Sequence, residues 1–247
     1  MTKRIAVVTG GTGGLGTAMS QALAKDERIV VAAYYPPEEM QAMEWQQQQK
    51  DEGFDLHVYP VDVADFESCE IFTQQIEQDL GPIEILINNA GITRDSVLKK
   101  MQKHQWDAVI QTNLSSVFNM TKPVFESMLN RGWGRIVNIS SVNGQRGQFG
   151  QANYSAAKAG VHGFTMAIAQ EGARKGVTAN SISPGYIATE MVMAIPEHIR
   201  NDIINEIPVG RLGEPFEIAR VAAFLCAEES GYITGADFYI NGGLYFH

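Results

Sequence analysis

The stretch VVTGGTGGLGTAM, residues 7–19, decides the fold of this 247-residue chain. An apolar run leads into five closely spaced glycines, and a helical pattern follows them. Such a loop lets the backbone approach a pyrophosphate closely, and the N-terminus of the following helix offers free N–H groups and a positive dipole end. A tight structural turn is the alternative, but the strand, loop and helix context predicts a dinucleotide site.

Apolar, strand-like runs recur outward from this loop, with helical patterns between them. They are continuously Val- and Ile-rich, which is typical of strands buried on both faces in a parallel sheet. The sequence therefore predicts an α/β fold: a single Rossmann-type, doubly wound parallel sheet of about seven strands with helices on both faces. The runs are RIAVVTG (4–10), RIVVAAY (28–34), DLHVYPVDV (55–63), IEILINNAG (83–91), GRIVNISS (134–141), VTANSISPG (177–185) and ADFYINGG (236–243).

The chain shows no internal repeat and no Pro/Ser/Gly-rich linker, so residues 1–247 are expected to form a single dinucleotide-binding domain. Residues 186–213 interrupt the alternation and predict a small, mobile lid of short helices. The net charge of −9 opposes non-specific adhesion to nucleic acid. No apolar run approaches the roughly 18 residues that a membrane-spanning helix needs, so we expect no membrane insertion.

Cysteine and histidine usage argues against a disulfide framework and a metal centre. Cys69 and Cys226 fall in helical patterns without metal or redox spacing, which predicts free, buried thiols in a reducing compartment, the cytoplasm. The histidines show no ligand spacing and no G-x-S-x-G elbow is present, so neither a metal site nor a hydrolase is expected. The histidines are His57, His104, His162, His198 and His247.

The segment QANYSAAKAG, residues 151–160, places a tyrosine and a lysine four residues apart. On a helix, Tyr154 and Lys158 lie on one face about one turn apart, so the ammonium can reach the neighbourhood of the phenol. A nearby cation favours the phenolate and lowers a tyrosine's pKa. The alternative is an amphipathic helix with a tyrosine at its rim and an exposed lysine.

Taken together, the motifs resemble those of the short-chain dehydrogenase/reductase family over essentially the whole chain. The glycine spacing is T-G-x-x-x-G-x-G rather than G-x-G-x-x-G, and the other matches follow in the family's order. They are Thr9, Gly10, Gly14 and Gly16, then Asp62-Val63, NNAG at 88–91, Asn113, Ser141, Tyr154-x-x-x-Lys158 and Pro184-Gly185.

The resemblance implies a nicotinamide coenzyme, with Asp62 and Val63 at the adenine and the NNAG segment beside a ribose. From the residues alone, Asp62 could instead cap the helix entering ADFESCEIF, and the two asparagines could simply close a strand end. The coenzyme-binding residues implied are Gly10, Gly11, Thr12, Gly13, Gly14, Leu15, Gly16, Asp62, Val63, Asn89, Ala90, Gly91, Tyr154, Lys158, Pro184, Gly185 and Ile187.

The choice between coenzymes depends on the end of the second strand, where an acidic residue would bind a ribose 2′-hydroxyl. Ala33 and Tyr34 stand there instead, and Gly13 stands where many NADP-using relatives have arginine. Lack of the acid removes the obstacle to a 2′-phosphate and favours NADP(H) over NAD(H), whereas Glu38 and Glu39 argue for NAD(H).

The resemblance also assigns the catalytic residues Ser141, Tyr154, Lys158 and Asn113. Tyr154 would donate a proton to a ketone oxygen, its pKa lowered by Lys158 and by the oxidised nicotinamide. Ser141 would hydrogen-bond the carbonyl, whereas Ser140 would point to the opposite face. Lys158 would hold the ribose hydroxyls, and Asn113 would relay protons through water.

Two branches of the family resemble the chain most: acetoacetyl-CoA reductases of polyhydroxybutyrate synthesis and 3-oxoacyl-[acyl-carrier-protein] reductases. RGWGRIVNISSVNGQRGQFGQANYSAAKAG followed by SPGYIAT favours the first, with (R)-3-hydroxybutyryl-CoA as product and an acyl-CoA thioester as partner. The substrate residues implied are Asp95, Lys100, Ser141, Gln148, Phe149, Gln151 and Tyr186. A non-catalytic dinucleotide-binding sensor is the alternative from another class.

The C-terminal stretch GYITGADFYINGGLYFH fits the homotetramer that the family implies. Asn241 stands where the family usually has an acidic residue before the closing Gly-Gly, which leaves the detail of that contact open.

Overall fold

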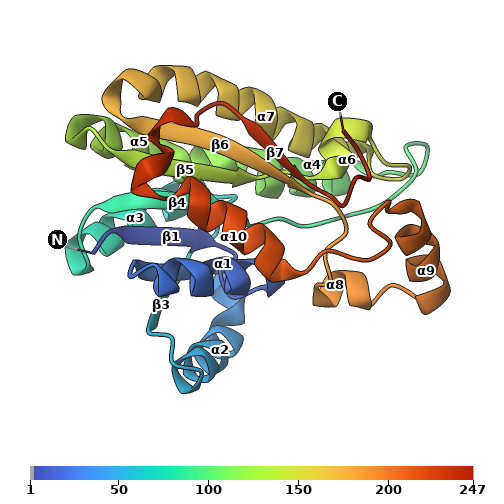
Figure 1. Ribbon diagram of the computed structural model, residues 1–247, viewed down its shortest axis with the longest axis horizontal. Coiled ribbons are helices and arrows are strands. Elements are labelled where there is room, and N and C mark those ends of the chain that lie inside the picture. Colours follow the sequence, from blue (N-terminus) through green and yellow to red (C-terminus); the bar gives the residue numbers. More distant parts are fainter. Residues whose placement is uncertain (1–2, 247) are drawn as a thin grey trace.

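Each of the seven apolar runs forms a strand in the computed structural model, which describes residues 3–246. The strands make one parallel sheet in the order β3-β2-β1-β4-β5-β6-β7, as predicted (Figure 1). Their bounds are β1 Ile5–Thr9, β2 Ile29–Tyr34, β3 Leu56–Pro60, β4 Ile83–Asn88, β5 Gly134–Ile139, β6 Val177–Pro184 and β7 Asp237–Ile240.

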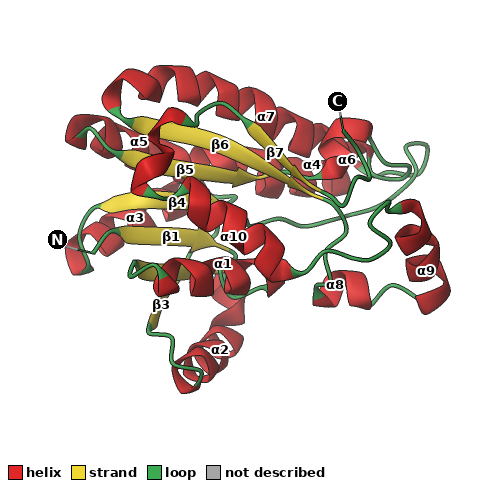
Figure 2. Ribbon diagram, viewed as in Figure 1, coloured by secondary structure: helices red, strands yellow, loops and turns green. Residues whose placement is uncertain are grey.

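Helices connect the strands and cover both faces of the sheet (Figure 2). The longer ones are α1 Gly14–Lys25, α2 Glu39–Asp51, α3 Phe66–Asp79, α4 Lys103–Ile110, α5 Ser116–Arg131, α7 Ala152–Gly172 and α10 Pro215–Leu225. The shorter ones are α6 Val142–Arg146, α8 Glu190–Met193, α9 Glu197–Glu206 and the 3-10 turns η1 Pro36–Glu38, η3 Ala173–Lys175 and η4 Glu228–Tyr232. A π-helical turn, η2 Gln111–Ser115, lies between α4 and α5.

Two hydrophobic cores form because successive side chains of a strand point to opposite faces. Val7 of β1 packs in the core under α3, α5 and α7, whereas its neighbour Val8 packs under α1 and α10. Leu86 and Ile87 of β4 divide in the same way. Burial on both sides explains why the strands read as continuous apolar runs.

Capping side chains set several helix boundaries. Asp65 caps α3 by accepting a hydrogen bond from the backbone N–H of Glu67 at 3.0 Å. Pro215 begins α10 at a position that needs no backbone donor, and Glu214 and Glu217 form a reciprocal capping box around it. The alternative that Asp62 caps α3 is wrong, because Asp65 is the N-cap residue of that helix.

The strand order reverses between β1 and β4, because β1 connects to β2 on one side and β4 connects to β5 on the other. In doubly wound sheets, ligands bind outside the carboxyl ends of the strands at such a switch point. Figure 1 shows these ends facing the side of the molecule that carries α8 and α9.

Residues 186–213, where a lid is expected, contain α8 and α9, and a bridge between Ile187 and Gly213 pairs the two ends of this segment. Across residues 3–246, no helix combines the length and apolar character needed to cross a bilayer. Cys69 and Cys226 are buried and unpaired, as predicted, and burial raises the pKa of each thiol to about 12.

Candidate active site at the carboxyl edge of the sheet

A cavity of about 840 Å³ lies at the switch point and is lined from four sides. The glycine loop after β1 forms one wall, the segments after β2 and β3 another, the segment after β4 a third, and the segments after β5 and β6 the fourth. Its volume falls in the range of small-molecule and cofactor sites. The predicted coenzyme residues gather here: Gly10, Thr12, Gly13, Gly14, Leu15, Gly16, Asp62, Val63, Asn89, Ala90, Gly91, Tyr154, Lys158, Pro184, Gly185 and Ile187.

The glycine loop is packed so closely that side chains are excluded from it. Gly10 has φ of 59°, and a Cβ on Gly16 would overlap the Gly10 carbonyl oxygen. A Cβ on Gly11 would lie 2.6 Å from the Cα of Ala32, so Gly11 packs the loop on β2 and does not line the cavity. The backbone N–H groups at the start of α1 therefore remain uncovered beside the cavity, a cradle suited to a pyrophosphate.

Thr9 and Asn89 join the two loops across the switch point. The Thr9 hydroxyl accepts hydrogen bonds from the backbone N–H of Asn89 at 2.9 Å and of Ala90 at 3.0 Å. The Asn89 amide donates in return to the carbonyls of Thr9 and Gly10 at 3.0 and 3.1 Å. Asn89 thus supports the glycine loop from the end of the neighbouring strand β4, a contact that the sequence did not reveal.

The first asparagine of NNAG, Asn88, has a different environment. It is buried and donates to Asn138 at 2.8 Å and to Thr121 at 3.2 Å. Asn138 in turn donates to Thr165 of α7 at 2.9 Å. This buried polar chain ties α5 and α7 to the ends of β4 and β5, beneath the site.

At the opening of the cavity near β3, the Asp62 carboxylate accepts from the backbone N–H of Ala64 at 3.0 Å. Asp62 and Val63 line the cavity, as the resemblance implies for residues at an adenine. Asn119 of α5 fixes the same loop by donating to the Val63 carbonyl at 3.0 Å.

Ser141 and Tyr154 meet at the inner end of the cavity. Ser141 lies two residues past β5 with extended backbone and caps α6 by accepting from the Asn143 N–H at 3.1 Å. The helix α7 brings Tyr154 to it, and the two hydroxyls are hydrogen-bonded. Ser140 points elsewhere, donating to the Lys158 carbonyl at 2.8 Å, as alternation predicts.

The electrostatics of Tyr154 differ from the prediction. Burial raises the pKa of the phenol above 10.0, the hydrogen bond with Ser141 opposes this rise, and the negative charge of Asp95 adds to it. The Lys158 ammonium lies over the Tyr154 ring, 5.7 Å from its centre, and donates to the Ile139 carbonyl. The protein alone therefore keeps Tyr154 protonated.

Lys158 shares one face of α7 with Tyr154, one turn further along, as predicted. Its ammonium is buried, lines the cavity and donates to the Ile139 carbonyl at 2.7 Å. Burial lowers the pKa of Lys158 from 10.5 to about 8, so the cation is costly to keep in this position.

Asn113 lies in the π-helical turn η2, a rare geometry that often marks functional positions. Its side chain is buried, accepting from the Ile92 N–H at 2.8 Å and donating to the Ile92 carbonyl at 2.9 Å. Asn113 thereby fixes the segment after β4 and packs beneath Gly91, but it does not itself line the cavity.

The end of the cavity beside β2 carries more negative than positive charge. Tyr34, Tyr35 and Glu38 line it next to Gly13, whereas Glu39 does not. Among the lining residues that the structure describes, the cations are Arg94 and Lys158, which come from the segment after β4 and from α7.

The substrate residues implied by the resemblance are only partly brought together. Ser141 lines the cavity, and Gln151 lies next to it, bonded to Asn143 at 3.0 Å and to Asp95 at 2.8 Å. Gln148 and Phe149 line a separate hollow of about 320 Å³.

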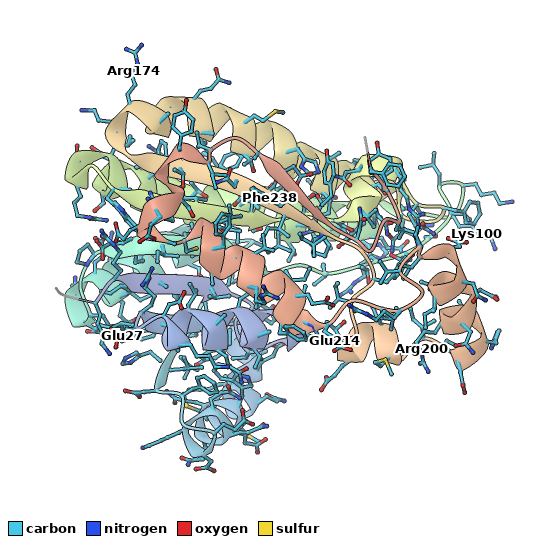
Figure 3. The ribbon with its side chains drawn as sticks, in the orientation of Figure 1. Glu27, Lys100, Arg174, Arg200, Glu214 and Phe238 are labelled. Carbon is cyan, nitrogen blue, oxygen red and sulfur yellow. The ribbon has the colours of Figure 1, made fainter. Side chains whose placement is uncertain are left out.

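The remaining two predicted substrate residues lie further apart. Tyr186 lines a smaller hollow of about 100 Å³ under the segment after β6. Lys100 is exposed and projects outward from the loop before α4 (Figure 3).

Several residues that line the cavity were not predicted from the sequence. Thr189 stands over the glycine loop, where its methyl group would lie 3.2 Å from a Cβ on Gly14. Thr189 follows the Pro-Gly pair in SPGYIAT, a signal that could have been used. Other lining residues lie on helices and loops without a local motif: Tyr35, Gln41, Trp45, Arg94, Glu190 and Val192.

Reduction of a carbonyl by a nicotinamide coenzyme needs a site for the pyrophosphate, a proton donor and a group that orients the carbonyl. All three occur here. A parallel sheet with this loop at its switch point and a Ser–Tyr–Lys group at its edge defines a dinucleotide-dependent oxidoreductase. Comparison with known proteins makes the assignment specific. The sequence profile described as short chain dehydrogenase matches residues 4–200, and the chain belongs to that family.

Individual relatives cover nearly the whole chain. The acetoacetyl-CoA reductase of Allochromatium vinosum is 57% identical over 244 residues, and that of Cupriavidus necator 58% identical over 245 residues. A 3-oxoacyl-[acyl-carrier-protein] reductase of Haemophilus influenzae is 42% identical over 245 residues. Each alignment covers 99% of this chain and 99% of the relative.

Proposed function

We propose that this chain reduces acetoacetyl-CoA to (R)-3-hydroxybutyryl-CoA and thereby supplies polyhydroxybutyrate synthesis. The observation that carries the proposal is the full-length similarity to relatives of that name at 57–58% identity, against 42% for the carrier-protein reductase. The hydrogen-bonded Ser141–Tyr154 pair beside Lys158 supports the chemistry.

The nicotinamide coenzyme, when bound, supplies a hydride to the 3-oxo carbon. Tyr154, held protonated by burial, donates its proton to the carbonyl oxygen, and Ser141 donates a hydrogen bond that orients this oxygen. Lys158 contributes positive charge next to the phenol and hydrogen bonds to a ribose. Asn113 holds the segment after β4 in place and, as the family implies, contributes to a water-mediated proton path.

We propose NADP(H) as the coenzyme, with a preference that Glu38 limits. The missing acid at Ala33 and Tyr34 leaves space for a 2′-phosphate, whereas the Glu38 carboxylate on the same wall repels it. The glycine loop, Asp62, Val63 and the segment from Asn89 to Gly91 would hold the rest of the dinucleotide.

The acyl thioester would enter beside α8 and the loop that carries Gln148 and Phe149. Thr189, Glu190 and Val192 already line the cavity from this side, which supports the proposal that residues 186–213 act as a lid. Asp95, Lys100, Gln151 and Tyr186 would contact the acyl group or pantetheine once the lid closes.

The whole chain, residues 1–247, would act as one domain in a homotetramer. Exposed aromatic side chains support the assembly: Phe66 of α3 and Phe118 of α5 stack at 6.0 Å on the surface, and Phe216 and Phe224 of α10 are more than half exposed. The unpaired thiols support a reducing cytoplasm. Light scattering during gel filtration tests the tetramer.

The proposed function is tested by following NADPH and NADH oxidation with purified protein and acetoacetyl-CoA. Rapid turnover that exceeds the rate with acetoacetyl carrier protein at equal concentration would support the proposal. Equal or faster turnover of the carrier-protein thioester would move the assignment to fatty-acid synthesis. Tight coenzyme binding without turnover of either thioester would favour the sensor.

A further inference from the structure

A second polar cluster lies directly behind the catalytic residues, between α7 and the last two strands. His162 occupies the same face of α7 as Tyr154 and Lys158, one turn beyond Lys158. Its Nδ1 lies 3.3 Å from a carboxylate oxygen of Asp237 on β7. Figure 1 shows α7, β6 and β7 running side by side, and β6 packs against both.

Asp237 is fixed by donors from several elements. Ser181 donates to its carboxylate at 2.8 Å and Ser183 at 2.9 Å, both from β6. Gln145 of α6 donates at 2.7 Å. A carboxylate with this many donors has little freedom to move, so the contact with His162 is made to a rigid acceptor.

The other ring nitrogen of His162 leads back to the active site. Nε2 lies 3.0 Å from the hydroxyl of Ser140, which is itself 2.8 Å from the Lys158 carbonyl. Ser140 lies between two residues of the site in the sequence. Ser141 follows it, and Ile139 precedes it and accepts a hydrogen bond from the Lys158 ammonium through its carbonyl. Asp237, His162 and Ser140 thus form one chain of contacts that ends between two catalytic residues.

The hydrogen bonds of this chain fix the protonation of the ring at Nδ1. Ser181 uses its proton on Asp237, so both groups that face Nδ1 are acceptors, and Nδ1 must carry the hydrogen. In the neutral ring Nε2 is then an acceptor, and the single Ser140 proton goes either to Nε2, 3.0 Å away, or to the Lys158 carbonyl, 2.8 Å away. In the charged ring Nε2 donates to Ser140, which donates to the Lys158 carbonyl.

Two charged groups act on His162, Asp237 from β7 and Lys158 from α7. Burial lowers the pKa of His162, Asp237 opposes this effect, and Lys158 adds to it. The groups contributed by the ends of β5 and by β6, Ser140 and Ser181, are uncharged. The neutral ring is therefore the form that the cluster favours near neutral pH.

The order serine, histidine, aspartate also occurs in hydrolases, but the arrangement here serves another purpose. Ser140 is among the residues that line the cavity, but it is only 3% exposed and its hydroxyl lies against the Lys158 carbonyl and His162. A nucleophile needs access to the scissile carbonyl. Ser140 lacks that access and can act only on its neighbours.

We propose that His162, anchored by Asp237, is a positioning residue: through Ser140 it sets the strand end that carries Ser141 relative to Lys158. The inference rests on the proposed reductase function, since it concerns the same catalytic residues. It also assigns a role to β7, the edge strand, which contacts neither the cavity nor the glycine loop among the described lining residues.

The test compares His162→Leu, His162→Gln and Asp237→Asn in the full-length enzyme with acetoacetyl-CoA and the better coenzyme. His162→Leu removes both polar contacts and should lower kcat about 10- to 100-fold, since small misplacements of reacting groups have effects of this size. Its coenzyme Kd, which depends on the distant glycine loop, should stay within about twofold. His162→Gln keeps an amide at the same place and should recover most of kcat.

Thr165→Val is the matched control, because it also removes a buried hydrogen bond between α7 and β5 but does not touch Ser140. It should lower the melting temperature as much as His162→Leu and leave kcat unchanged. A kcat loss in both variants that follows the loss of stability would overturn the positioning role. An unchanged kcat in His162→Leu would also overturn it.

A readout without substrate separates this inference from the proposed function. In protein with ¹³C-labelled histidine, the His162 resonance, assigned by its absence in His162→Gln, should titrate below the ordinary histidine pKa of 6.5. Asp237→Asn should lower its pKa further. Titration of His162 with a pKa at or above 6.5 would overturn the inference even if acetoacetyl-CoA were reduced, and a wild-type protein without turnover would refute only the function.

Discussion

At the scale of single residues, Tyr154 and Lys158 show how burial sets the protonation of catalytic groups before the coenzyme binds. Burial raises the pKa of the phenol, and it lowers the pKa of the ammonium to about 8. Both shifts favour the neutral form of the group. A protonated phenol is the form that a reductase needs, so the structure prepares Tyr154 for proton donation rather than for proton abstraction.

Tyr154→Phe tests that role most directly. The variant keeps the ring and its packing but has no proton to donate, so kcat should fall by about 10²- to 10⁴-fold, the usual contribution of a general acid. The coenzyme Kd, measured by quenching of protein fluorescence, should change little. Turnover within a few-fold of the wild type would show that another group donates the proton.

Lys158→Met should separate stability from activity. The unfolded lysine titrates near 10.5 and the folded one near 8, so the unfolded chain binds more protons between these values. Stability contributed by this group therefore rises with pH across that window, and its cost is greatest below pH 8. Removal of the ammonium should raise the free energy of unfolding by about 2 kcal/mol at pH 7. This figure is what remains after about 1 kcal/mol is subtracted for the lost hydrogen bond to Ile139.

The gain from Lys158→Met should shrink towards pH 10, while turnover is lost at every pH. Calorimetric melting at pH 7 and pH 10 measures the difference. Lys100→Met, which alters a lysine exposed at the surface (Figure 3), is the control and should change the free energy of unfolding by less than about 0.5 kcal/mol at either pH. A gain in stability over the wild type that is smaller at pH 7 than at pH 10 would contradict the argument.

Glu38 should set the limit on NADPH use. Glu38→Gln removes the negative charge from the wall beside Tyr34 and Tyr35, so the ratio of kcat/KM for NADPH to that for NADH should rise about tenfold, equivalent to about 1.4 kcal/mol. Glu39→Gln is the matched control, because Glu39 is its neighbour but does not line the cavity. Equal ratios in the two variants would remove Glu38 from coenzyme selection.

At the scale of elements, the glycine loop is the part of the chain that tolerates substitution least. Gly16→Ala would place a methyl group on the Gly10 carbonyl, and the loop would have to move away from β1. Coenzyme affinity should fall at least tenfold, measured by calorimetric titration. Gly163→Ala adds the same atom in open space on α7 and should instead stabilise the protein by about 0.5–1 kcal/mol with unchanged affinity. Tight coenzyme binding by Gly16→Ala would refute the cradle.

The elements are also where the sequence was most informative. All seven strands and the glycine loop follow from local patterns, because an apolar run and a strand–loop–helix signature are properties of neighbouring residues. Ser141, Tyr154 and Lys158 meet as expected because each follows a recognisable motif.

Contacts that depend on the third dimension could not be predicted from these patterns. The Thr9–Asn89 clamp joins residues 80 positions apart, and the Lys158 ammonium turns to Ile139 because the chain folds back there. The π-helical turn at Asn113 and the separate hollow of Gln148 arise from packing, which no local spacing records.

At the scale of the whole molecule, function and stability occupy opposite ends of the sheet. The carboxyl ends of the strands carry the cavity, whereas the amino ends carry a cluster around Trp133. The guanidinium groups of Arg4 and Arg135 lie 3.5 and 4.4 Å from the centre of the indole. Arg4 also pairs with Glu84 and Glu228, which joins β1, β4 and η4.

Arg135 stabilises the amino ends of the strands, and its substitution tests whether stability and function are separated along the sheet. It is 2% exposed and donates to the backbone carbonyls of Gly134, Gly176, Ala227 and Glu228 at 2.9 to 3.2 Å. Arg135→Met leaves these buried acceptors without a donor, so the free energy of unfolding should fall by about 3 kcal/mol in urea titrations. Because the cavity lies at the other end of the strands, the coenzyme Kd should not change.

The control is Arg174→Met, since Arg174 projects into solvent at the end of α7 (Figure 3) and its loss should change stability by less than about 0.5 kcal/mol. A rigid sheet transmits strain. An increased coenzyme Kd in Arg135→Met at temperatures well below melting would therefore show that the two ends of the strands are coupled. An unchanged Kd with reduced stability would show instead that the amino ends of the strands stabilise the fold without tuning the site.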